Sequence, residues 1–548
     1  MYSFKTILII FLIAANALLG KAQQNTNYPS ELKQLHENIW TDFLKGSSDN
    51  DNIKKISEQL NDQGAWPDID YASKQRGNWH PAGHLSKLQT LAKAWQRPGS
   101  LYYHDAALLA KIHLALNYWL KNDFQCPNWW YPQIGVPVSL APTMILLENE
   151  LSKEQMALGI KILDRAKIGM TGQNKVWLSG NVILKSLLLR DIETIRKASA
   201  SIQEELKVSL EEGIQPDGSF HQHGPQIQFG NYGLAYVGDM ITWIKILRNT
   251  PFSFDESKMA ILRNYLIEGQ QWIVWKNQMD VSACGRQLFI DAQLNKARSL
   301  SGFLRQMETL DPAYAELYKK ANQYESLKGE VVVKEKSEKT LPAESSVTIN
   351  PRWILHDNTG YFFPEGGTLK LETATVTGSW NQVALMYKNE SILASIFKLW
   401  FDHGTKPDNQ KYAYCLVPAA TKAILSQMEK SPSFTILKND TTLQAVVTPD
   451  ATLGGAIFYK AGKIKLLSSI EVDKPCIVMV EKEKGALKIS LSDPTQKLDQ
   501  IKLTLNGKYK TKDSGISLKT EKGKSMLVVS LPKGGEAGKT VFLNLDIL

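Results

Sequence analysis

The sequence predicts a multidomain α+β protein in which a helical half is followed by a β half. From about residue 30 to 325, apolar residues recur at helical spacing, as Leu108, Ile112 and Leu116 do, and Pro- or Gly-containing breaks separate the segments. In the C-terminal half, apolar residues alternate with polar ones, as in 487–491. Because the strands follow the helices rather than alternating with them, we expect separate helical and β domains.

The helical half contains several apolar segments of this kind joined by loops. Val182, Ile183, Leu187 and Leu188 repeat the helical spacing further along the chain. Many helices joined by loops indicate either a helical bundle or an α/α toroid, and the spacing leaves both open.

The composition changes between the two halves. Residues 330–339 are rich in charge and Pro342 follows, which indicates a linker or an edge strand between domains. Beyond this segment, 526–531 and 541–548 are strand candidates, and the Asn-Gly pair at 506–507 is a hairpin signal.

Length and charge narrow the classes of function. A chain of 548 residues is long enough for roughly two or three domains. Its 43% hydrophobic and 22% charged residues are typical of a soluble globular protein. The net charge of +9 favours anionic partners. No basic run or nucleic-acid-binding motif occurs, so no nucleic acid partner is expected. An acidic glycan is another anionic candidate, which the charge alone does not select.

The N-terminus has the pattern of a signal peptide. Lys5 precedes an apolar core from Ile7 to Leu19, and Gly20-Lys21-Ala22 is a small-x-small cleavage site. The apolar run is short for a transmembrane span and no later stretch qualifies, so no membrane insertion is expected. We therefore expect an exported protein, secreted or periplasmic, whose mature chain begins at Gln23.

The cysteines and histidines give no metal or disulfide signature. The four cysteines are widely spaced, which predicts buried free thiols. His80 and His84 are four residues apart, but Pro81 and Gly83 lie between them, which favours a structural role. His221 and His223 have no further ligand cluster. No metal or other cofactor is predicted.

The segment from Asp217 to Gly233 is the strongest candidate for chemistry. It places His223 and Tyr232 nine residues apart in a loop rich in Gly, Asn and Gln, directly after a Pro-Asp-Gly turn signal. A histidine and a tyrosine in such a loop suit proton transfer on an anionic substrate. The competing interpretation is a capping or buried His223 and a core Tyr232.

Three further clusters lie in loop-like parts of the helical half. Asn128, Trp129 and Trp130 precede a Pro/Gly-containing stretch, where the indoles either stack on sugar rings or pack in the core. Asn174 follows a glycine-containing turn and either binds a carboxylate or is an ordinary turn asparagine. Arg286 follows a glycine and either contacts substrate or forms a structural salt bridge.

All four clusters occur in an order that resembles the signature of polysaccharide lyase family 8, the chondroitin AC, hyaluronan and xanthan lyases. In the β half, residues 353–364 resemble the family's "HD.VGY.FP" strand, and residues 397–414 resemble its "HG..P..A.Y.Y" segment. Residues 489–496 resemble a motif of its C-terminal domain. The similarity covers most of the mature chain.

The resemblance implies an incomplete α/α toroid, an antiparallel β supersandwich and a small C-terminal β domain. On this basis we expect a signal peptide at 1–22, the toroid at 23–325, a linker at 326–350, the central β-sandwich domain at 351–460 and the C-terminal β domain at 461–548. It also implies an enzyme, a monomer, that cleaves an acidic polysaccharide by β-elimination without a cofactor.

The family's catalytic residues carry over to four positions. Asn174 matches the amide that binds the uronate carboxylate, His223 and Tyr232 match the catalytic pair, and Arg286 matches the arginine beside the tyrosine. A free tyrosine titrates near pH ~10, so a cationic neighbour such as Arg286 is needed for it to act as a base at neutral pH.

The substrate-binding residues implied by the resemblance are Trp129 and Trp130, which match the family's sugar-stacking aromatic patch, together with Asn128.

Two departures from the family pattern support an alternative function. The family's second arginine lies four residues after the first, and that position is Ile290 here. The β strands that normally supply an Asn-x-Glu motif before the "HD.VGY.FP" strand are missing. The alternative is therefore a catalytically weak or inactive glycan-binding relative. An α/α-toroid hydrolase is a third possibility, but no pair of carboxylates lies among the four clusters.

Overall fold

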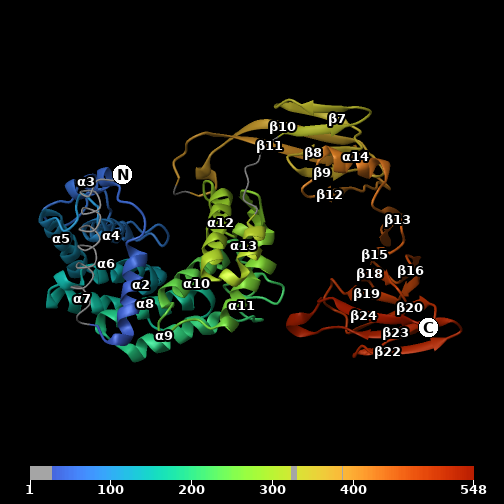
Figure 1. Ribbon diagram of the computed structural model, residues 1–548. Coiled ribbons are helices and arrows are strands. Elements are labelled where there is room, and N and C mark those ends of the chain that lie inside the picture. The colour runs from blue at the N-terminus through green and yellow to red at the C-terminus, as the bar shows by residue number, and fades with distance from the viewer. Residues whose placement is uncertain (1–27, 323–329, 385–386) are drawn as a thin grey trace, which may run out of the picture. The chain divides into compact units, whose positions relative to one another are not determined.

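The computed structural model describes residues 28–322, 330–384 and 387–548 (Figure 1). The expected signal peptide, 1–22, lies outside the described residues. The chain divides into two compact units. The helical unit comprises Met1–Ser326 together with Trp380–Asn389, and the β unit comprises Leu327–Ser379 together with Glu390–Leu548.

The helical unit is built from twelve described α-helices. These are α2 (Ser30–Phe43), α3 (Asn50–Glu58), α4 (Ala82–Gln96), α5 (Ala106–Asn122), α6 (Val136–Leu146), α7 (Lys153–Leu163), α8 (Gly172–Leu189), α9 (Ile192–Glu205), α10 (Leu234–Leu247), α11 (Glu256–Asn264), α12 (Ala292–Leu310) and α13 (Ala315–Ala321). Two short hairpins, β1 (Gly213–Ile214) with β2 (Phe220–His221) and β3 (Val274–Trp275) with β4 (Gln278–Met279), interrupt them.

Alternate helices form an inner row. In this row α4 contacts α6, α6 contacts α8, α8 contacts α10 and α10 contacts α12, while α5 contacts α7 outside it. This alternation is the packing of an α/α toroid, one of the two arrangements that the helical spacing left open. The inner helices α6, α8 and α10 are apolar on most sides, which is the pattern of helices buried on all faces.

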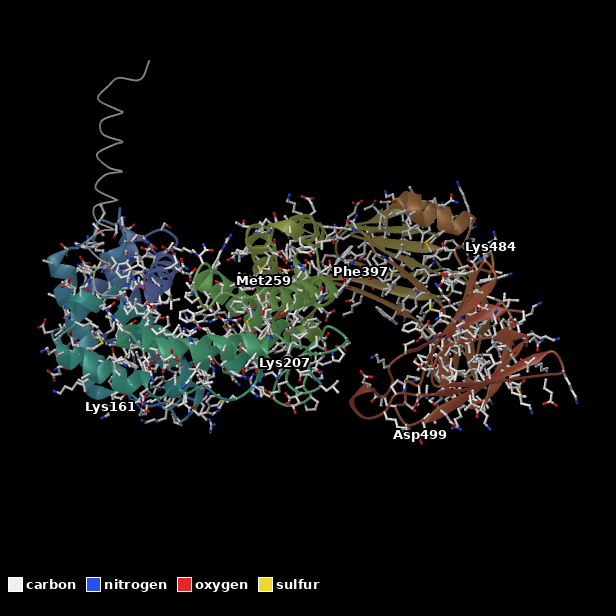
Figure 2. All side chains as sticks on the ribbon, turned by 60° about the horizontal axis from the view of Figure 1, so that its bottom comes forward. Lys161, Lys207, Met259, Phe397, Lys484 and Asp499 are labelled. Atoms are coloured by element: carbon white, nitrogen blue, oxygen red, sulfur yellow. The ribbon has the colours of Figure 1, made fainter. Side chains whose placement is uncertain are left out.

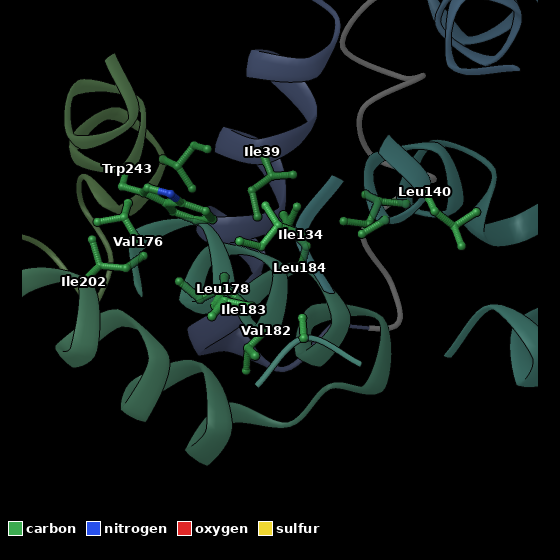
Figure 3. Close-up of a cluster of buried hydrophobic side chains, with 14 of the residues drawn as sticks. Ile39, Ile134, Leu140, Val176, Leu178, Val182, Ile183, Leu184, Ile202 and Trp243 are labelled. Carbon is green, nitrogen blue, oxygen red and sulfur yellow. The ribbon is translucent and has the colours of Figure 1, made fainter. Parts of the chain in front are cut away.

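The core of the unit surrounds α8. Figure 3 shows Leu178, Ile183 and Leu184 on this helix among side chains from other elements, including Ile39 and Trp243. Some of the lysines that contribute to the positive net charge lie at the surface of this unit. Lys161 on α7 and Lys207 after α9 are exposed (Figure 2).

Polar caps mark where several outer helices begin. Asp105, Asp191 and Asp255 each accept a hydrogen bond from a backbone N–H in the first turn of α5, α9 and α11. Ser152 and Gln155 form a complete capping box at the start of α7. These caps satisfy backbone donors that a helix leaves free at its N-terminus, so the local sequence determines these starts.

The β unit contains antiparallel sheets and one helix, α14 (Lys422–Lys430). Its first strands are β5 (Val331–Lys334), β6 (Glu338–Leu341), β7 (Ser345–Ile349), β8 (Trp353–His356), β9 (Thr359–Phe362), β10 (Leu369–Gly378), β11 (Ile392–Phe401) and β12 (Cys415–Val417). They form a three-stranded sheet, β11-β10-β7, and a five-stranded sheet, β12-β9-β8-β5-β6.

The remaining strands form two further sheets. They are β13 (Thr435–Asn439), β14 (Leu443–Val447), β15 (Leu453–Phe458), β16 (Gly462–Lys465), β17 (Ser469–Val472), β18 (Cys476–Glu483), β19 (Ala486–Ser492), β20 (Gln500–Asn506), β21 (Tyr509–Lys510), β22 (Ile516–Glu521), β23 (Lys524–Ser530) and β24 (Val541–Ile547). The sheet orders are β13-β14-β15-β18-β19-β24-β21 and β16-β17-β20-β23-β22. One apolar core lies between these sheets, as in a β-sandwich.

The predicted α+β fold class with separate helical and β domains is confirmed. Leu487, Ile489 and Leu491 on β19 are buried while the residues between them are more exposed, as the alternation predicts. The prediction of a hairpin at 506–507 is wrong, because β20 pairs with β17 and β23 while the next strand, β21, pairs with β24 in another sheet. Gly507 lets the chain turn there with a φ of +114°.

The segment expected as a linker or edge strand, 326–350, contains β5, β6 and β7. β6 is an edge strand, but β5 is an interior strand of its sheet. The reason is that Val331 and Val333 belong to one apolar core and Val332 to another, so β5 is covered on both faces.

The last sandwich also begins earlier than the expected boundary at 461. β13, β14 and β15 lie between residues 435 and 458, and they pair in the same sheet as β18 and β19.

The cysteines are free thiols, as expected. Cys126, Cys284 and Cys476 are buried and Cys415 is partly exposed. His84 has the structural role that the sequence favours, because it is buried with its ring nitrogens 2.9 Å from the Tyr71 hydroxyl and from the Ala115 carbonyl.

Across the described ranges, no three His, Cys, Asp or Glu side chains gather into a group that would hold a metal ion. The helices described there also lack the combination of length and apolar character that a membrane crossing requires.

Replacement of Ile183 by alanine is expected to destabilise the helical unit by about 2–5 kcal/mol. The side chain is fully buried in α8, so its loss leaves a cavity in the core. Most of the 14 tryptophans lie in this unit, so urea unfolding followed by tryptophan fluorescence measures the effect. Lys161→Ala, on the exposed face of α7, is the control and is expected to change the unfolding free energy by less than about 0.5 kcal/mol. Equal shifts for the two variants would contradict the packing around α8.

Candidate active site

Three of the four predicted catalytic residues meet at the hydroxyl of Tyr232. His223 Nε2 lies 3.0 Å from Tyr232 Oη, and Arg286 Nη2 donates a hydrogen bond to the same oxygen at 3.2 Å. The His223 and Tyr232 rings meet edge to face at a centroid distance of 5.0 Å. A phenol oxygen between an imidazole and a guanidinium is arranged for proton transfer next to a fixed positive charge.

Tyr232 lies in a π-helical turn, η3 (Phe229–Gly233), directly before α10. Gly230 lets this turn approach the segment that precedes Arg286, because a Cβ there would lie 2.4 Å from Met279 Sδ and 2.8 Å from the Ala283 carbonyl. Lys296 on α12 donates to the Gly230 carbonyl and to Gln287 Oε1, each at 2.6 Å. The turn that carries Tyr232 and the segment that carries Arg286 are thus joined by close packing and one lysine.

His223 is held in a left-handed backbone conformation, with a φ of +63°. The loop around it is fixed by Glu212, whose Oε1 accepts a hydrogen bond from the Gly224 N–H at 2.9 Å. Glu212 Oε2 accepts hydrogen bonds from the Gln222 side-chain amide and from the Thr171 hydroxyl. Positive φ in a non-glycine residue is uncommon and persists where the surroundings hold it, as these contacts do.

Asn174 lies in the first turn of α8, close to the same loop. Gln173 N–H donates to Gln222 Oε1 at 2.9 Å, so the start of α8 is tied to the residue before His223. Glu205 Oε2 accepts from the Gly172 N–H at 2.8 Å and fixes the helix start from the other side. Asn174 is 6% exposed, and its Oδ1 has no hydrogen-bond partner among the described residues. A buried polar atom without a partner costs about 1–3 kcal/mol, which a bound ligand can offset.

Asp239 on α10 forms hydrogen bonds with two side chains in the first turns of α8. It accepts hydrogen bonds from the Gln173 side-chain amide and from Trp177. Burial raises the pKa of the Asp239 carboxyl to about 6, although these two hydrogen bonds act in the opposite direction. Trp177, held in this way, contacts the Tyr232 ring at a centroid distance of 6.1 Å.

Of the predicted sugar-binding residues, Trp130 is linked to the site through Trp177. The Trp130 and Trp177 rings are 5.7 Å apart, and Trp129 is 39% exposed. Asn128 is engaged within the protein, because its Nδ2 donates to the Arg76 carbonyl at 2.8 Å and its Oδ1 accepts from the Trp130 N–H at 3.2 Å. Asn128 therefore shapes the turn that presents the two indoles, and direct contact of Asn128 with substrate stays a prediction.

Position 290 holds an isoleucine and no cation, and its contact is a hydrogen bond from the backbone. The Ile290 N–H donates to Tyr387 Oη at 3.4 Å, and the Tyr387 and Trp380 rings are 6.2 Å apart. Tyr387 belongs to the 380–389 segment that is part of the helical unit.

Sequence reasoning missed four residues that organise the site: Glu212, Asp239, Lys296 and Trp177. Their partners lie nine to 66 positions away in the chain or on other elements, as with Gln173 and Asp239. Glu212 is visible in the sequence as an acidic residue shortly before the His223 loop. Its spacing alone does not predict that it accepts hydrogen bonds from Thr171 and from both neighbours of His223.

Family comparisons match the chain along most of its length. The model for the N-terminal alpha-helical domain of polysaccharide lyase family 8 matches residues 16–327. The model for the super-sandwich domain of that family matches 318–429, and the model for its C-terminal beta-sandwich domain matches 435–502.

Individual relatives agree with these matches. A chondroitinase-AC from Pedobacter heparinus is 24% identical over 711 aligned positions, covering 98% of this chain and 99% of the relative. Because 711 exceeds the 548 residues here, gaps must open in this chain, consistent with a shortened β half.

Solved structures support the fold alone. A chondroitinase AC lyase, solved in oligosaccharide complexes, superposes with a TM-score of 0.77 at 21% identity, covering 94% of this chain and 100% of that one. A Paenibacillus xanthan lyase gives a TM-score of 0.74 at 16% identity, covering 96% and 71%.

Replacement of Asp239 by asparagine is expected to remove a pH-dependent part of the folding stability. The carboxyl has a pKa of about 6 in the folded chain against an ordinary 3.8, so the folded state retains its proton longer than the unfolded state. This contribution is fully present below about pH 4 and is lost as the pH rises through about 6. The stability of the native chain relative to Asp239→Asn should therefore fall by up to about 3 kcal/mol over this range.

Urea unfolding of both chains at pH 4, 5, 6 and 7 measures this difference. Asparagine retains an oxygen that accepts hydrogen bonds, so the variant is expected to fold. A difference between the two chains that does not change with pH would contradict the buried carboxyl.

Proposed function

Because the chain belongs to polysaccharide lyase family 8, we propose that it cleaves uronic-acid-containing glycans of the chondroitin or hyaluronan class by β-elimination. The single observation that supports this proposal most strongly is the Tyr232 hydroxyl, in contact with both His223 and Arg286. Asn174, with a buried oxygen that lacks a partner, lies at the start of the helix tied to the His223 loop.

The first requirement of the reaction is to acidify the proton on C5 of the uronate. That proton is α to a carboxylate, whose negative charge opposes formation of a carbanion. Hydrogen bonding to the carboxyl group by Asn174 offsets that charge and stabilises the enolate-like intermediate. The donor to that carboxylate is the side-chain amide N–H of Asn174, because an ionised carboxylate only accepts hydrogen bonds.

Tyr232 then transfers one proton between two atoms of the substrate. As a phenolate beside the Arg286 charge, its oxygen takes the C5 proton, and His223 is in reach to accept the original phenol proton. The electrons left on C5 form the C4–C5 double bond as the C4–O4 bond breaks. O4 leaves with the proton from Tyr232, so the products are a 4,5-unsaturated uronate and a new hydroxyl group, and no water is consumed.

The contacts of Tyr232 favour elimination over hydrolysis. A glycoside hydrolase ordinarily uses two carboxylic acids that flank the scissile bond. Among the described residues, the side-chain partners of Tyr232 Oη are a histidine and an arginine, and neither can act as such an acid pair.

A catalytically weak glycan-binding relative is the second candidate function. Ile290 stands where the family has a second arginine, and its backbone contacts Tyr387. The loss of this cation removes one group that would hold the substrate anion, while the aromatic side chains at 129 and 130 are retained.

Export and oligomeric state are also part of the proposal. The N-terminal sequence pattern supports a secreted or periplasmic monomer, and the net charge of +9 supports attraction of a polyanion.

Replacement of Tyr232 by phenylalanine is expected to reduce turnover roughly 100- to 10,000-fold, because the ring stays but the proton carrier is lost. The mature chain is incubated with chondroitin, hyaluronan and xanthan, and the ultraviolet absorbance of the conjugated unsaturated uronate is followed.

Tyr103→Phe is the matched control, because Tyr103 is 47% exposed and outside the site. It is expected to retain native turnover. No absorbance increase by the native chain on any polymer, combined with retained binding, would support the binding relative instead. New reducing ends without unsaturated product would indicate a hydrolase.

A further inference from the structure

The helical unit contains a cavity of about 340 Å³ that none of the predicted site residues lines. Its walls come from the segment before α4 and from the first turns of α4, with Tyr131 closing one side. The walls are fixed by the protein itself. The Trp79 N–H donates to Tyr131 Oη at 3.1 Å, and Trp79 Nε1 donates to the Ser73 carbonyl at 3.1 Å. The cavity is therefore preformed.

A continuous set of ring contacts joins this cavity to the catalytic tyrosine. From Tyr232 the contacts pass to Trp177 at 6.1 Å and from Trp177 to Trp130 at 5.7 Å. They continue to Tyr131 at 5.3 Å and from Tyr131 to Trp79 at 5.3 Å. We call these five side chains the aromatic path. Trp177, Trp130 and Tyr131 are each partly exposed, whereas Trp79 is buried against Tyr131. Aromatic side chains suit the apolar faces of sugar rings, and Tyr131 itself lines the cavity, so this exposed part of the path leads from Tyr232 to it.

The polar groups in the cavity suit an uncharged sugar. Asp68, Asn78, His80 and Ser86 line it, whereas no lysine or arginine does. The Asp68 carboxylate is paired with Lys87 Nζ, at 2.6 and 2.7 Å, so its charge is offset from outside the lining. Hydroxyl and amide groups of a sugar can hydrogen-bond to such a lining. A carboxylate or sulfate group placed there would find no unpaired cation, because no lysine or arginine lines the cavity and Lys87 is already paired with Asp68.

We propose that this cavity is a distal subsite for an uncharged N-acetylhexosamine unit of the polymer, reached along the aromatic path. The ligand class rests on the proposed function, because only a glycan held at Tyr232 would be delivered along this path. The subsite would increase affinity for long chains and would disfavour a sulfated unit at that position.

Replacement of Ser86 by tryptophan tests the subsite by filling it. Ser86 is exposed on α4 and lines the cavity, and neither it nor α4 contributes a residue to the catalytic group. Binding is measured by calorimetry with unsulfated chondroitin oligosaccharides of increasing length, on chains that carry Tyr232→Phe so that nothing is cleaved. We expect affinity to rise at one length and Ser86→Trp to abolish that gain, about 10-fold, equivalent to about 1.4 kcal/mol.

Turnover by chains that retain Tyr232 provides the second measurement. Ser86→Trp is expected to raise KM for the polymer about 10-fold, with kcat unchanged and short oligosaccharides unaffected. Asp68→Asn is expected to reduce the preference for unsulfated over sulfated chains. Ala110→Trp, an equally bulky change at an exposed position on α5, is the control and should change neither binding nor KM.

The outcomes separate the subsite from the catalytic proposal. Turnover by the native chain with no effect of Ser86→Trp on binding or KM overturns the subsite and leaves the lyase intact. Length-dependent binding that Ser86→Trp abolishes, without turnover by the native chain, supports the subsite and overturns the lyase. Absence of both binding and turnover on every uronate polymer overturns both.

Discussion

The site depends on the attachment of the first turn of α8 to the loop that carries His223. Glu212 receives hydrogen bonds from Thr171, Gln222 and Gly224, so one carboxylate joins the helix start to both sides of His223. Charge-assisted hydrogen bonds to backbone and amide donors are stronger than neutral ones, which suits this role. With the Gln173 N–H bond to Gln222 Oε1, this clamp holds His223, with its positive φ, beside Tyr232.

Two of the three π-helical turns among the described residues lie where the chemistry is expected, and the third, η4 (Tyr265–Gly269), follows α11. Tyr232 lies in a π-helical turn, and Trp130 directly precedes another, η1 (Tyr131–Gly135). Single π-helical turns are frequent at functional sites because they re-aim one side chain without ending the helix. Behind them, the buried faces of α8 and α10 provide a rigid base. Asp239 joins those two helices through Gln173 and Trp177.

The helical unit brings His223 and Arg286 to the hydroxyl of Tyr232. Position 290 holds no cation, and the Ile290 N–H donates to Tyr387 Oη from the 380–389 segment. The Tyr387 and Trp380 rings lie 6.2 Å apart, so an aromatic pair and not a second cation lies beside position 290.

The sequence by itself determined the order of the helical and β halves, the helix starts with Asp or Ser caps, and the alternating strands such as β19. These features follow from contacts between residues close in the chain, so local spacing predicts them. The residue types at Asn174, His223, Tyr232 and Arg286 were equally visible. Their geometry was not, because Tyr232 and Arg286 are 54 positions apart and meet only when Gly230 packs against Met279.

Only the tertiary structure decided the roles of Glu212, Asp239 and Lys296. Each acts on groups from distant segments, and a charged residue looks the same in the sequence whether it is solvated or buried against such partners. The tertiary structure also decided the place of β5. In the sequence it is part of the charged segment expected as a linker or edge strand, but it is an interior strand because two separate cores cover its valines. Burial depends on what the rest of the chain brings to each face, and local sequence does not contain that information.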